Sequence, residues 1–275
     1  MTSSTSAASE LADTYPFRIV DHHLHTRWSD GRFSPADLVQ MAGEKGYRIG
    51  ISDHAGPKSG GIQAHNVDAY IADLRQHPVY RGIELDVAYG MTFPNEKTAG
   101  LDYVIGSLHG VMRDGQFKAL DGMFRWVQTN GKAPYVPDVD LSDPEVWIEE
   151  WLAILRHCFE TTPIDILGHP TLTPILPLDP DPEKAYKPEW EERLCALALE
   201  YRIALEISGR YRLPHERLLR TGKDMGVMFA IGSDGHQPGQ ICDLAYPLQA
   251  IEKIGIPPEQ IFDVNRKPRA AKRAA

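Results

Sequence analysis

The sequence predicts an α/β protein whose strands run parallel and form a barrel. Short runs rich in Ile, Val and Leu alternate with amphipathic helical stretches along the 275 residues. Strands joined by helical crossovers lie parallel, and a ring of such strands gathers its carboxyl ends on one face. No repeat and no Gly/Ser-rich linker divides the chain, so a single domain is predicted over residues 17–265.

Seven runs predict the strands. Each is a short, mostly apolar stretch bounded by turn residues or helix signals, which is the pattern of a buried parallel strand. In chain order they are Arg18–His25, Arg48–Asp53, Val79–Asp86, Asp102–Ser107, Asp165–Gly168, Arg202–Ser208 and Val227–Ser233.

The helices between these strands begin at recognisable caps. Ser34 precedes Pro35, which places a capping hydroxyl before a proline at the first helical position. Ser142 with Glu145 predicts a capping box. The predicted helices are one that begins at Pro35, Val67–Gln76 after a cap at Asn66, Val146–Phe159, Pro188–Tyr201 and Pro214–Met225.

The segment 111–163 is too long for a plain crossover. It contains Trp126, Trp147 and Trp151 but only one convincing helical pattern. Insertions of this kind shape the mouth of a barrel. We expect its tryptophans to pack a local core rather than to stack on a ligand.

Composition limits the classes of partner. Lys and Arg total 29 against 38 Asp and Glu, a net charge of −9, which argues against an extended nucleic-acid partner. Residues 1–16 and 266–275 predict a mobile arm and a basic tail. No run approaches the roughly 18 apolar residues of a membrane helix, and no secretory signal is visible. Cys158, Cys195 and Cys242 form no CxxC pair, so we expect a cytoplasmic protein without disulfides.

Histidines and carboxylates gather at the predicted strand ends. The first strand ends in His23-Leu24-His25, and the alternation of strand side chains turns both imidazoles to one face. Six of the eleven histidines and three carboxylates lie at or just beyond strand ends, where a parallel barrel forms its active site. These nine residues are His23, His25, Asp30, His54, Glu84, His109, His169, Asp234 and His236.

This donor set predicts a metal centre. Imidazole with carboxylate suits Zn, Mn and Fe, and nine donors suffice for two to three divalent transition metals that share carboxylates. Closely spaced ions suit displacement at phosphorus. The other histidines are expected to be structural or exposed: His22, His65, His77, His157 and His215.

Four motifs resemble those of the PHP family, the polymerase and histidinol phosphatase superfamily. They are Asp21-His22-His23-Leu24-His25 with Ser29-Asp30-Gly31, Ser52-Asp53-His54, Gly106-Ser107-Leu108-His109, and Ser233-Asp234-Gly235-His236. Glu84 and His169 fill the remaining two places. The resemblance implies a distorted (β/α)7 barrel, which is TIM-barrel-like with seven strands. It also implies up to three ions bound by the nine residues above, and hydrolysis of phosphate esters. Stand-alone, histidinol-phosphatase-like members are the most similar type, with a small phosphorylated substrate.

The resemblance and the chemistry of metal sites together predict a mechanism. A hydroxide that bridges two ions is the expected nucleophile, because metal coordination lowers the pKa of water from about 15.7 toward 7. Glu84 is expected to be the bridging carboxylate, and Asp234 a ligand that also shuttles a proton. Arg210 is expected to clamp the phosphate, with Arg113 as its competitor, because a guanidinium matches phosphate geometry. Glu206 is expected to orient a ligand histidine or to pair with an arginine.

Two other functions stay open. Amidohydrolase-like hydrolases of C–N or C–O bonds also begin with His-x-His, but they typically carry a lysine in mid-barrel, and no lysine lies at a predicted strand end here. A phosphoesterase of nucleotides or short oligonucleotides is the second alternative. The run from Leu205 to Arg210 departs from some PHP members, and the segment 111–163 resembles no histidinol phosphatase, so both features bear on the substrate.

Overall fold

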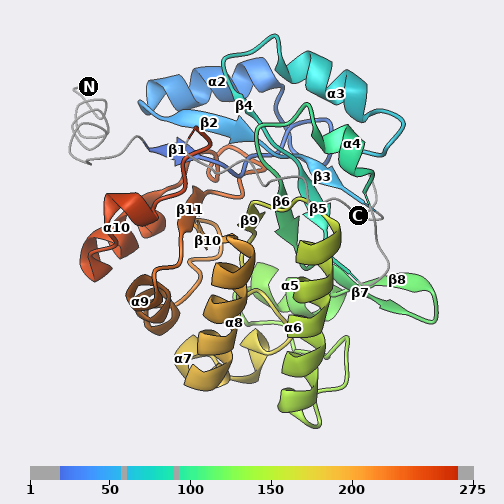
Figure 1. The fold of residues 1–275 in the computed structure, drawn as a ribbon, viewed down its shortest axis with the longest axis vertical. Coiled ribbons are helices and arrows are strands. Elements are labelled where there is room, and N and C mark those ends of the chain that lie inside the picture. The colour runs from blue at the N-terminus through green and yellow to red at the C-terminus, as the bar shows by residue number, and fades with distance from the viewer. Residues whose placement is uncertain (1–18, 57–60, 89–92, 266–275) are drawn as a thin grey trace.

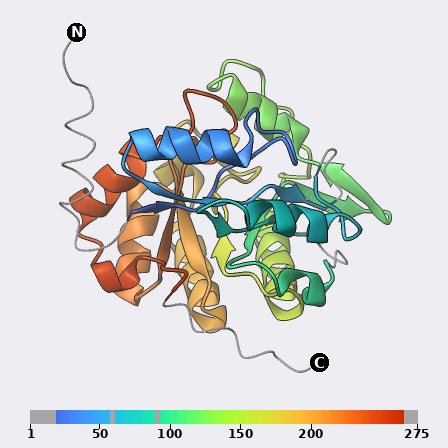
Figure 2. The ribbon, with the colours of Figure 1, turned by 90° about the horizontal axis from the view of Figure 1, so that it is seen from above.

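The computed structural model describes residues 19–56, 61–88 and 93–265. The predicted arm 1–16, the basic tail 266–275 and Arg18 at the start of the first predicted strand lie outside the described residues. Short strands occupy the centre of the molecule and helices lie around them (Figures 1 and 2). Within the described ranges, no helix combines the length and the apolar character needed to cross a membrane.

The central strands form two parallel sheets, which confirms the prediction of an α/β fold. One sheet has the order β1-β2-β4 and the other the order β11-β10-β9-β6-β5-β3. The strands are β1 (Val20–Asp21), β2 (Arg48–Ile51), β3 (His54–Ala55), β4 (Tyr80–Arg81), β5 (Glu84–Asp86), β6 (Ile105–Ser107), β9 (Ile166–Leu167), β10 (Ala204–Ser208) and β11 (Phe229–Gly232).

Two predicted strands differ in the structure. The third, Val79–Asp86, is divided into β4 and β5, whereas the second, Arg48–Asp53, contains β2 and is followed directly by a strand that was not predicted, β3. The break lies where the chain changes partner: β2 pairs with β1 and β4, whereas β3 pairs with β5. The first strand is also shorter than predicted, because the main chain from His23 to His25 bonds to Gly235 instead of continuing a ladder.

Main-chain hydrogen bonds connect the two sheets at both junctions. At one junction His22 N donates to Ile231 O at 2.9 Å, and Gly235 N donates to His23 O at 3.2 Å. At the other junction Glu84 N donates to Asp53 O at 3.0 Å. The strands that carry the first and last predicted motifs therefore lie side by side, although the regular ladders form two sheets and a closed ring stays a prediction.

The outer helices follow the predicted order with corrected ends. The longer helices of the second half pack against one another, α6 against α8, α8 against α9 and α9 against α10. The sequence patterns did not predict α4, α5, α7 and α10. The helices are α2 (Pro35–Glu44), α3 (Val67–Leu74), α4 (Asn95–Thr98), α5 (Asp121–Gln128), α6 (Pro144–Thr161), α7 (Pro182–Ala185), α8 (Pro188–Tyr201), α9 (Glu216–Met225) and α10 (Ala245–Ile254), with 3₁₀ turns at Leu176–Leu178 and Pro258–Gln260.

The predicted caps are confirmed at α2, correct in position alone at α3, and wrong at α6. Ser34 caps α2, and Asp37 completes a reciprocal capping box. Asn66 precedes α3, but its side chain makes no cap. The predicted Ser142 box of α6 is wrong, because Asp143 is the N-cap and accepts a hydrogen bond from Glu145 N at 3.0 Å. Pro144 then occupies the first helical position, which favours this frame.

The interior below the strand ends is filled by a tyrosine. Tyr103 is fully buried and donates from its hydroxyl to His22 O at 2.5 Å. A Cβ added at Gly82 would lie 2.3 Å from the Tyr103 ring, so this close approach requires glycine. His22 packs edge-on against Tyr103 and Phe262, and burial lowers its pKa to about 4. His22 is therefore a neutral structural residue, as predicted.

The segment 111–163 folds into a hairpin and two helices. β7 (Gly110–Arg113) and β8 (Gln116–Ala119) pair antiparallel and project from the side of the molecule (Figure 1). Trp147 and Trp151 on α6 are both buried in the apolar core. The expectation that tryptophans of this segment pack a core is confirmed for these two residues.

The corrected cap of α6 gives the first prediction. Asp143→Ala should lower the free energy of unfolding by about 1 kcal/mol, because it removes the acceptor for the Glu145 N–H. Ser142→Ala should change it by less than about 0.5 kcal/mol, since the Ser142 hydroxyl faces Asp140 outside the helix. Urea unfolding of both variants measures the difference, and a larger loss for Ser142→Ala would contradict the assigned cap.

Candidate metal centre

The nine predicted ligands converge on one end of the parallel strands. The pairing of β3 with β5 sets His54 directly opposite Glu84. The remaining ligands follow the carboxyl ends of other strands or lie on the loops beyond them. His23, His25 and Asp30 follow β1, His109 follows β6, His169 follows β9, and Asp234 and His236 follow β11.

Glu84 is the centre of this group. Its side chain is fully buried, and ring nitrogens of five histidines lie 2.6–3.6 Å from its two oxygens. The shortest approach is 2.6 Å, from His54 Nδ1 to Glu84 Oε2. The other four are His23, His25, His109 and His169. One carboxylate therefore meets five imidazoles from four separate segments of the chain, an arrangement that suits a bridging ligand.

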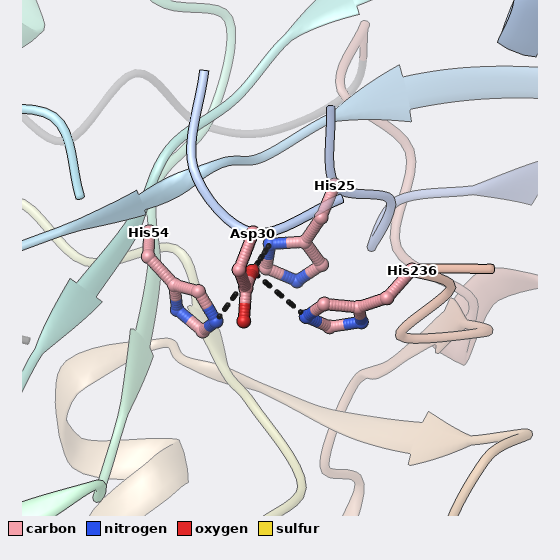
Figure 3. Close-up of side chains that lie close together, drawn as sticks. All are labelled: His25, Asp30, His54 and His236. Carbon is pink, nitrogen blue, oxygen red and sulfur yellow. Dashed lines mark ion pairs between the residues drawn. The ribbon is translucent and has the colours of Figure 1, made fainter. Parts of the chain in front are cut away.

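Four residues form a second, more open group around Asp30. Asp30 Oδ1 lies 3.1 Å from His236 Nε2, 3.5 Å from His54 Nε2 and 3.9 Å from His25 Nδ1. The three imidazoles point at this carboxylate from three sides (Figure 3). Asp30 is 47% exposed, whereas His25 is fully buried. This group therefore faces solvent, and Glu84 lies behind it.

Asp234 and Arg210 complete the site. Asp234 Oδ1 lies 3.2 Å from His25 Nε2, and its Oδ2 lies 3.4 Å from Arg210 Nη1. Arg210 Nη1 is also 3.0 Å from His236 Nδ1. Asp234 has a φ of +50° and His169 a φ of +29°, backbone conformations that are uncommon outside glycine. Such strain is typical of functional positions, where surrounding contacts hold it in place.

The donor set fits divalent transition metals. Both oxygens of Glu84 and both ring nitrogens of His25 are buried without a hydrogen bond of proper geometry among the described residues. Three overlapping groups have ligand atoms close enough to hold one ion each: His25 with Asp30, His54 and His236; His23 with His25 and Glu84; and His54 with Glu84 and His109. Buried polar atoms of this kind require a partner. A Zn, Mn or Fe ion would be such a partner, because nitrogen and oxygen atoms at this spacing suit the coordination of these metals.

The charges of the site complement one another. Burial alone would raise the pKa of Glu84, but His54, His23 and His109 hold it well below its usual range. Burial would likewise raise the pKa of Asp234, and Arg210 with His23 holds it low. Burial, with the nearby His236 and His54, keeps the pKa of His25 well below its usual range, so that imidazole is neutral. Ionised carboxylates and a neutral imidazole are the forms that bind cations.

Two further carboxylates orient the ligand imidazoles from behind. Glu206 Oε1 lies 2.7 Å from His23 Nδ1, and its Oε2 accepts from His169 N at 2.6 Å. Asp86 Oδ1 lies 2.7 Å from His109 Nδ1. Of the two roles considered for Glu206, the contacts are those of a residue that orients a histidine. A Cβ at Gly232 would come within 2.0 Å of Glu206 Oε1, so glycine makes room for this carboxylate.

The structure separates the two arginines proposed for phosphate. Arg210 contacts two of the predicted metal ligands, Asp234 and His236. Arg113 instead forms an ion pair with Glu150 through two hydrogen bonds, at 2.5 and 2.9 Å. Sequence reasoning missed Asp86 and Tyr211. The strand alternation could have found Asp86, which lies two residues after Glu84 on the same face. Tyr211 packs its ring 5.5 Å from that of His169, and no sequence pattern marks it.

The remaining histidines lie outside this group. His65 is exposed, and His77 is 3.9 Å from Asp73. His215 is buried and lies 2.6 Å from Glu191, which also receives Arg217. These placements agree with the prediction that such histidines are structural or exposed.

Comparison with known sequences gives a consistent match. A model of the PHP domain matches residues 21–209. The DNA polymerase/3'-5' exonuclease PolX of Bacillus subtilis (strain 168) is 24% identical over 248 residues, which cover 85% of this chain but only 37% of PolX. A probable phosphatase of Aliivibrio fischeri (strain MJ11) is 26% identical over 262 residues, covering 89% of this chain and 88% of the phosphatase.

A solved structure supports the fold. The histidinol phosphate phosphatase of Lactococcus lactis subsp. lactis Il1403, in complex with Zn, L-histidinol and phosphate, matches with a TM-score of 0.57 at 16% identity. The match covers 89% of this chain and 98% of that protein. At this identity the likeness establishes the arrangement of helices and strands.

The carboxylate behind His23 gives the second prediction. Glu206→Gln should weaken Zn²⁺ binding about 10- to 100-fold, because an amide that donates to His23 Nδ1 moves the ring proton to Nε2, the nitrogen facing Glu84. Competition with a chromophoric chelator measures the affinity. Glu200→Gln is the matched control, since Glu200 forms a surface ion pair with Arg156. Equal affinities for the wild type and Glu206→Gln would contradict this role.

Proposed function

The chain belongs to the PHP family, and on that premise we propose that it is a metal-dependent hydrolase of small phosphomonoesters, similar in substrate type to histidinol phosphate. One observation carries the proposal: the buried Glu84 carboxylate meets five imidazoles, while a second, solvent-facing group surrounds Asp30. Such a two-part arrangement can hold neighbouring cations beneath an opening that a phosphate group can enter.

We infer that the strands close into the seven-stranded (β/α)7 barrel that the sequence predicts. The hydrogen bonds between His22 and Ile231 and between Gly235 and His23 support closure between the first and last strands. Parallel pairing of the other neighbours and the likeness to the Lactococcus lactis phosphatase support it further. Closure accounts for the convergence of ligands from all sides, because every strand then ends at the same rim.

The nine residues would hold two to three divalent ions, with Zn, Mn or Fe the candidates. The His25, Asp30, His54 and His236 group suits one ion, and the two groups that share Glu84 suit one or two more. When bound, such ions supply a hydroxide nucleophile at neutral pH and polarise the phosphoryl group. The zinc complex of the Lactococcus lactis enzyme makes zinc the first metal to test.

Two carboxylates of the chain would position the metal ligands and move a proton. Glu84 fixes the spacing of the donors that surround it, because its two oxygens meet different histidines. Asp234 is the proposed proton shuttle: its ionised carboxylate lies between His25 and Arg210 and would carry a proton only transiently. A carboxylate so placed can pass a proton to the leaving alcohol.

Arg210 is the proposed clamp for the phosphate. It follows β10, its guanidinium reaches the Asp234 carboxylate and His236, and it stacks over the Tyr211 ring at 5.1 Å. A guanidinium held by stacking keeps donors available for phosphoryl oxygens. Arg113 offers fewer, because Glu150 takes both of its terminal nitrogens.

The proposed reaction gives the third prediction. The purified chain loaded with Zn²⁺ or Mn²⁺ should release phosphate from small phosphomonoesters, and a chelator should abolish turnover until either metal is restored. Elemental analysis should find about two to three transition-metal ions per chain. The substrate panel includes histidinol phosphate, sugar phosphates, AMP, short RNA oligonucleotides, amides and lactones.

The panel distinguishes the alternatives. Turnover of amides or lactones without phosphate release would favour an amidohydrolase-like enzyme. Preferential cleavage of AMP or RNA would favour a phosphoesterase of nucleotides or oligonucleotides. Full activity after complete removal of metals would contradict the proposal outright.

Comparison of the two arginines gives the fourth prediction. Arg210→Ala should lower kcat/KM about 10- to 100-fold, because a charge-assisted hydrogen bond to the phosphate contributes about 1.5–3 kcal/mol. Arg113→Ala should have the smaller effect, and Arg156→Ala, which alters a surface ion pair, is the control. Steady-state kinetics with one phosphomonoester decides; a larger loss for Arg113→Ala would reverse the assignment.

A further inference from the structure

A buried carboxylate outside the nine ligands organises the open group around Asp30. Asp53 is fully buried at the end of the second predicted strand, directly before His54. Its main-chain N–H donates to the hydroxyl of Tyr70, another fully buried residue, which fixes Asp53 from behind. The Asp53 carboxylate points instead to the loop that follows β1.

Three donors of that loop meet the Asp53 carboxylate. Thr26 N and Ser29 Oγ both donate to Oδ1 at 2.7 Å, and Thr26 Oγ1 donates to Oδ2 at 2.7 Å. The Thr26 hydroxyl in turn accepts from Trp28 N at 3.2 Å. Hydrogen bonds to an ionised acceptor are the strong ones. The turn from Thr26 to Ser29 is therefore tied to one carboxylate.

Each of these partners is a chain neighbour of a ligand. Thr26 follows His25, Ser29 precedes Asp30, and Asp53 precedes His54. The fourth ligand of the open group is joined through the same loop, because Arg32 N donates to His236 O at 3.0 Å. One side chain thus sets the separation of three ligands whose own side chains come from two distant parts of the sequence.

This link matters most for Asp30. Asp30 is 47% exposed and lies on the loop five residues beyond His25, so the packing of the core does not fix it. We propose that Asp53 is the positioning residue of the open group, and that its hydrogen bonds to Thr26 and Ser29 set the affinity of the one ion held by His25, Asp30, His54 and His236. The inference rests on the proposed metal centre and adds a residue that binds no ion itself.

Asp53→Asn tests the proposal with little change in shape. An amide offers one acceptor oxygen and turns a donor nitrogen toward the donors of the loop, so at least one bond is lost. A Mn²⁺ titration, read by the EPR signal of the unbound ion, should show one class of site weakened about 10- to 100-fold and the others nearly unchanged. Elemental analysis after dialysis should find about one ion fewer per chain than in the wild type.

Two further variants complete the design. Ser29→Ala removes a single donor and should weaken the same class of site by a smaller factor. Asp73→Asn is the matched control, because Asp73 holds the same loop through Trp28 Nε1 at 2.7 Å but touches neither Asp53 nor a ligand. Its Mn²⁺ binding should equal that of the wild type. Circular dichroism establishes that each variant is folded.

The outcomes separate this inference from the proposed function. Wild-type protein that binds no Mn²⁺ would overturn the metal centre and this inference together. Wild-type binding with unchanged constants in folded Asp53→Asn would overturn only the role of Asp53, as would equal weakening of every class of site. Should Asp53→Asn not fold, Ser29→Ala decides, and unchanged binding in that variant overturns the inference.

Discussion

The burial of the Glu84 carboxylate is the constraint on which the rest of the structure depends. A buried charge is strongly destabilising unless it is compensated by opposite charges or by metals. Glu84 is compensated by five imidazoles, and no single strand could supply them, because only alternate residues of a strand share a face. Different strands must therefore end at one level around Glu84. The opposition of His54 and Glu84 across β3 and β5 is one element of register that this requirement fixes.

The same requirement extends outward to the residues behind the ligands. An imidazole that turns one nitrogen to Glu84 leaves its second nitrogen to be satisfied inside the protein. Glu206 meets this need for His23 and also holds the main chain of His169, which has a positive φ. Backbone strain of this kind costs on the order of 1–3 kcal/mol and persists only where neighbours over-determine it. Gly232 in turn leaves the space that Glu206 occupies. Each residue that satisfies a buried polar group thus restricts which residue can lie beside it.

The sequence predicted the features that recur from strand to strand, which are the apolar runs and the metal-ligand residue types at their ends. Each of the seven predicted runs contains at least one observed strand, and the nine predicted ligands lie together because strand ends in parallel sheets converge. It could not place the contacts of Glu206, because a carboxylate that faces an imidazole has the same local pattern as one that faces an arginine. It also missed the separate strand β3 and the division of the third predicted strand. These follow from which neighbour each half pairs with, and pairing is a property of the whole fold. The Ser142 cap failed because Asp143 and Pro144 offer an equally good start one residue later.

An acidic chain that accepts an anionic substrate needs a local reversal of charge. The net charge of −9 counts against a long polyanion, which would sense the whole surface. Two to three divalent cations would carry more charge than Asp30, Glu84 and Asp234 together. Arg210 adds a further positive group beside them. Burial alone would lower the pKa of this arginine, but the neighbouring Asp234 carboxylate raises it, so the guanidinium stays charged. The exposed side of Asp30 is then the place where a compact phosphate group meets positive potential. On the proposed function, this distribution of charge would favour a small phosphomonoester over extended nucleic acid.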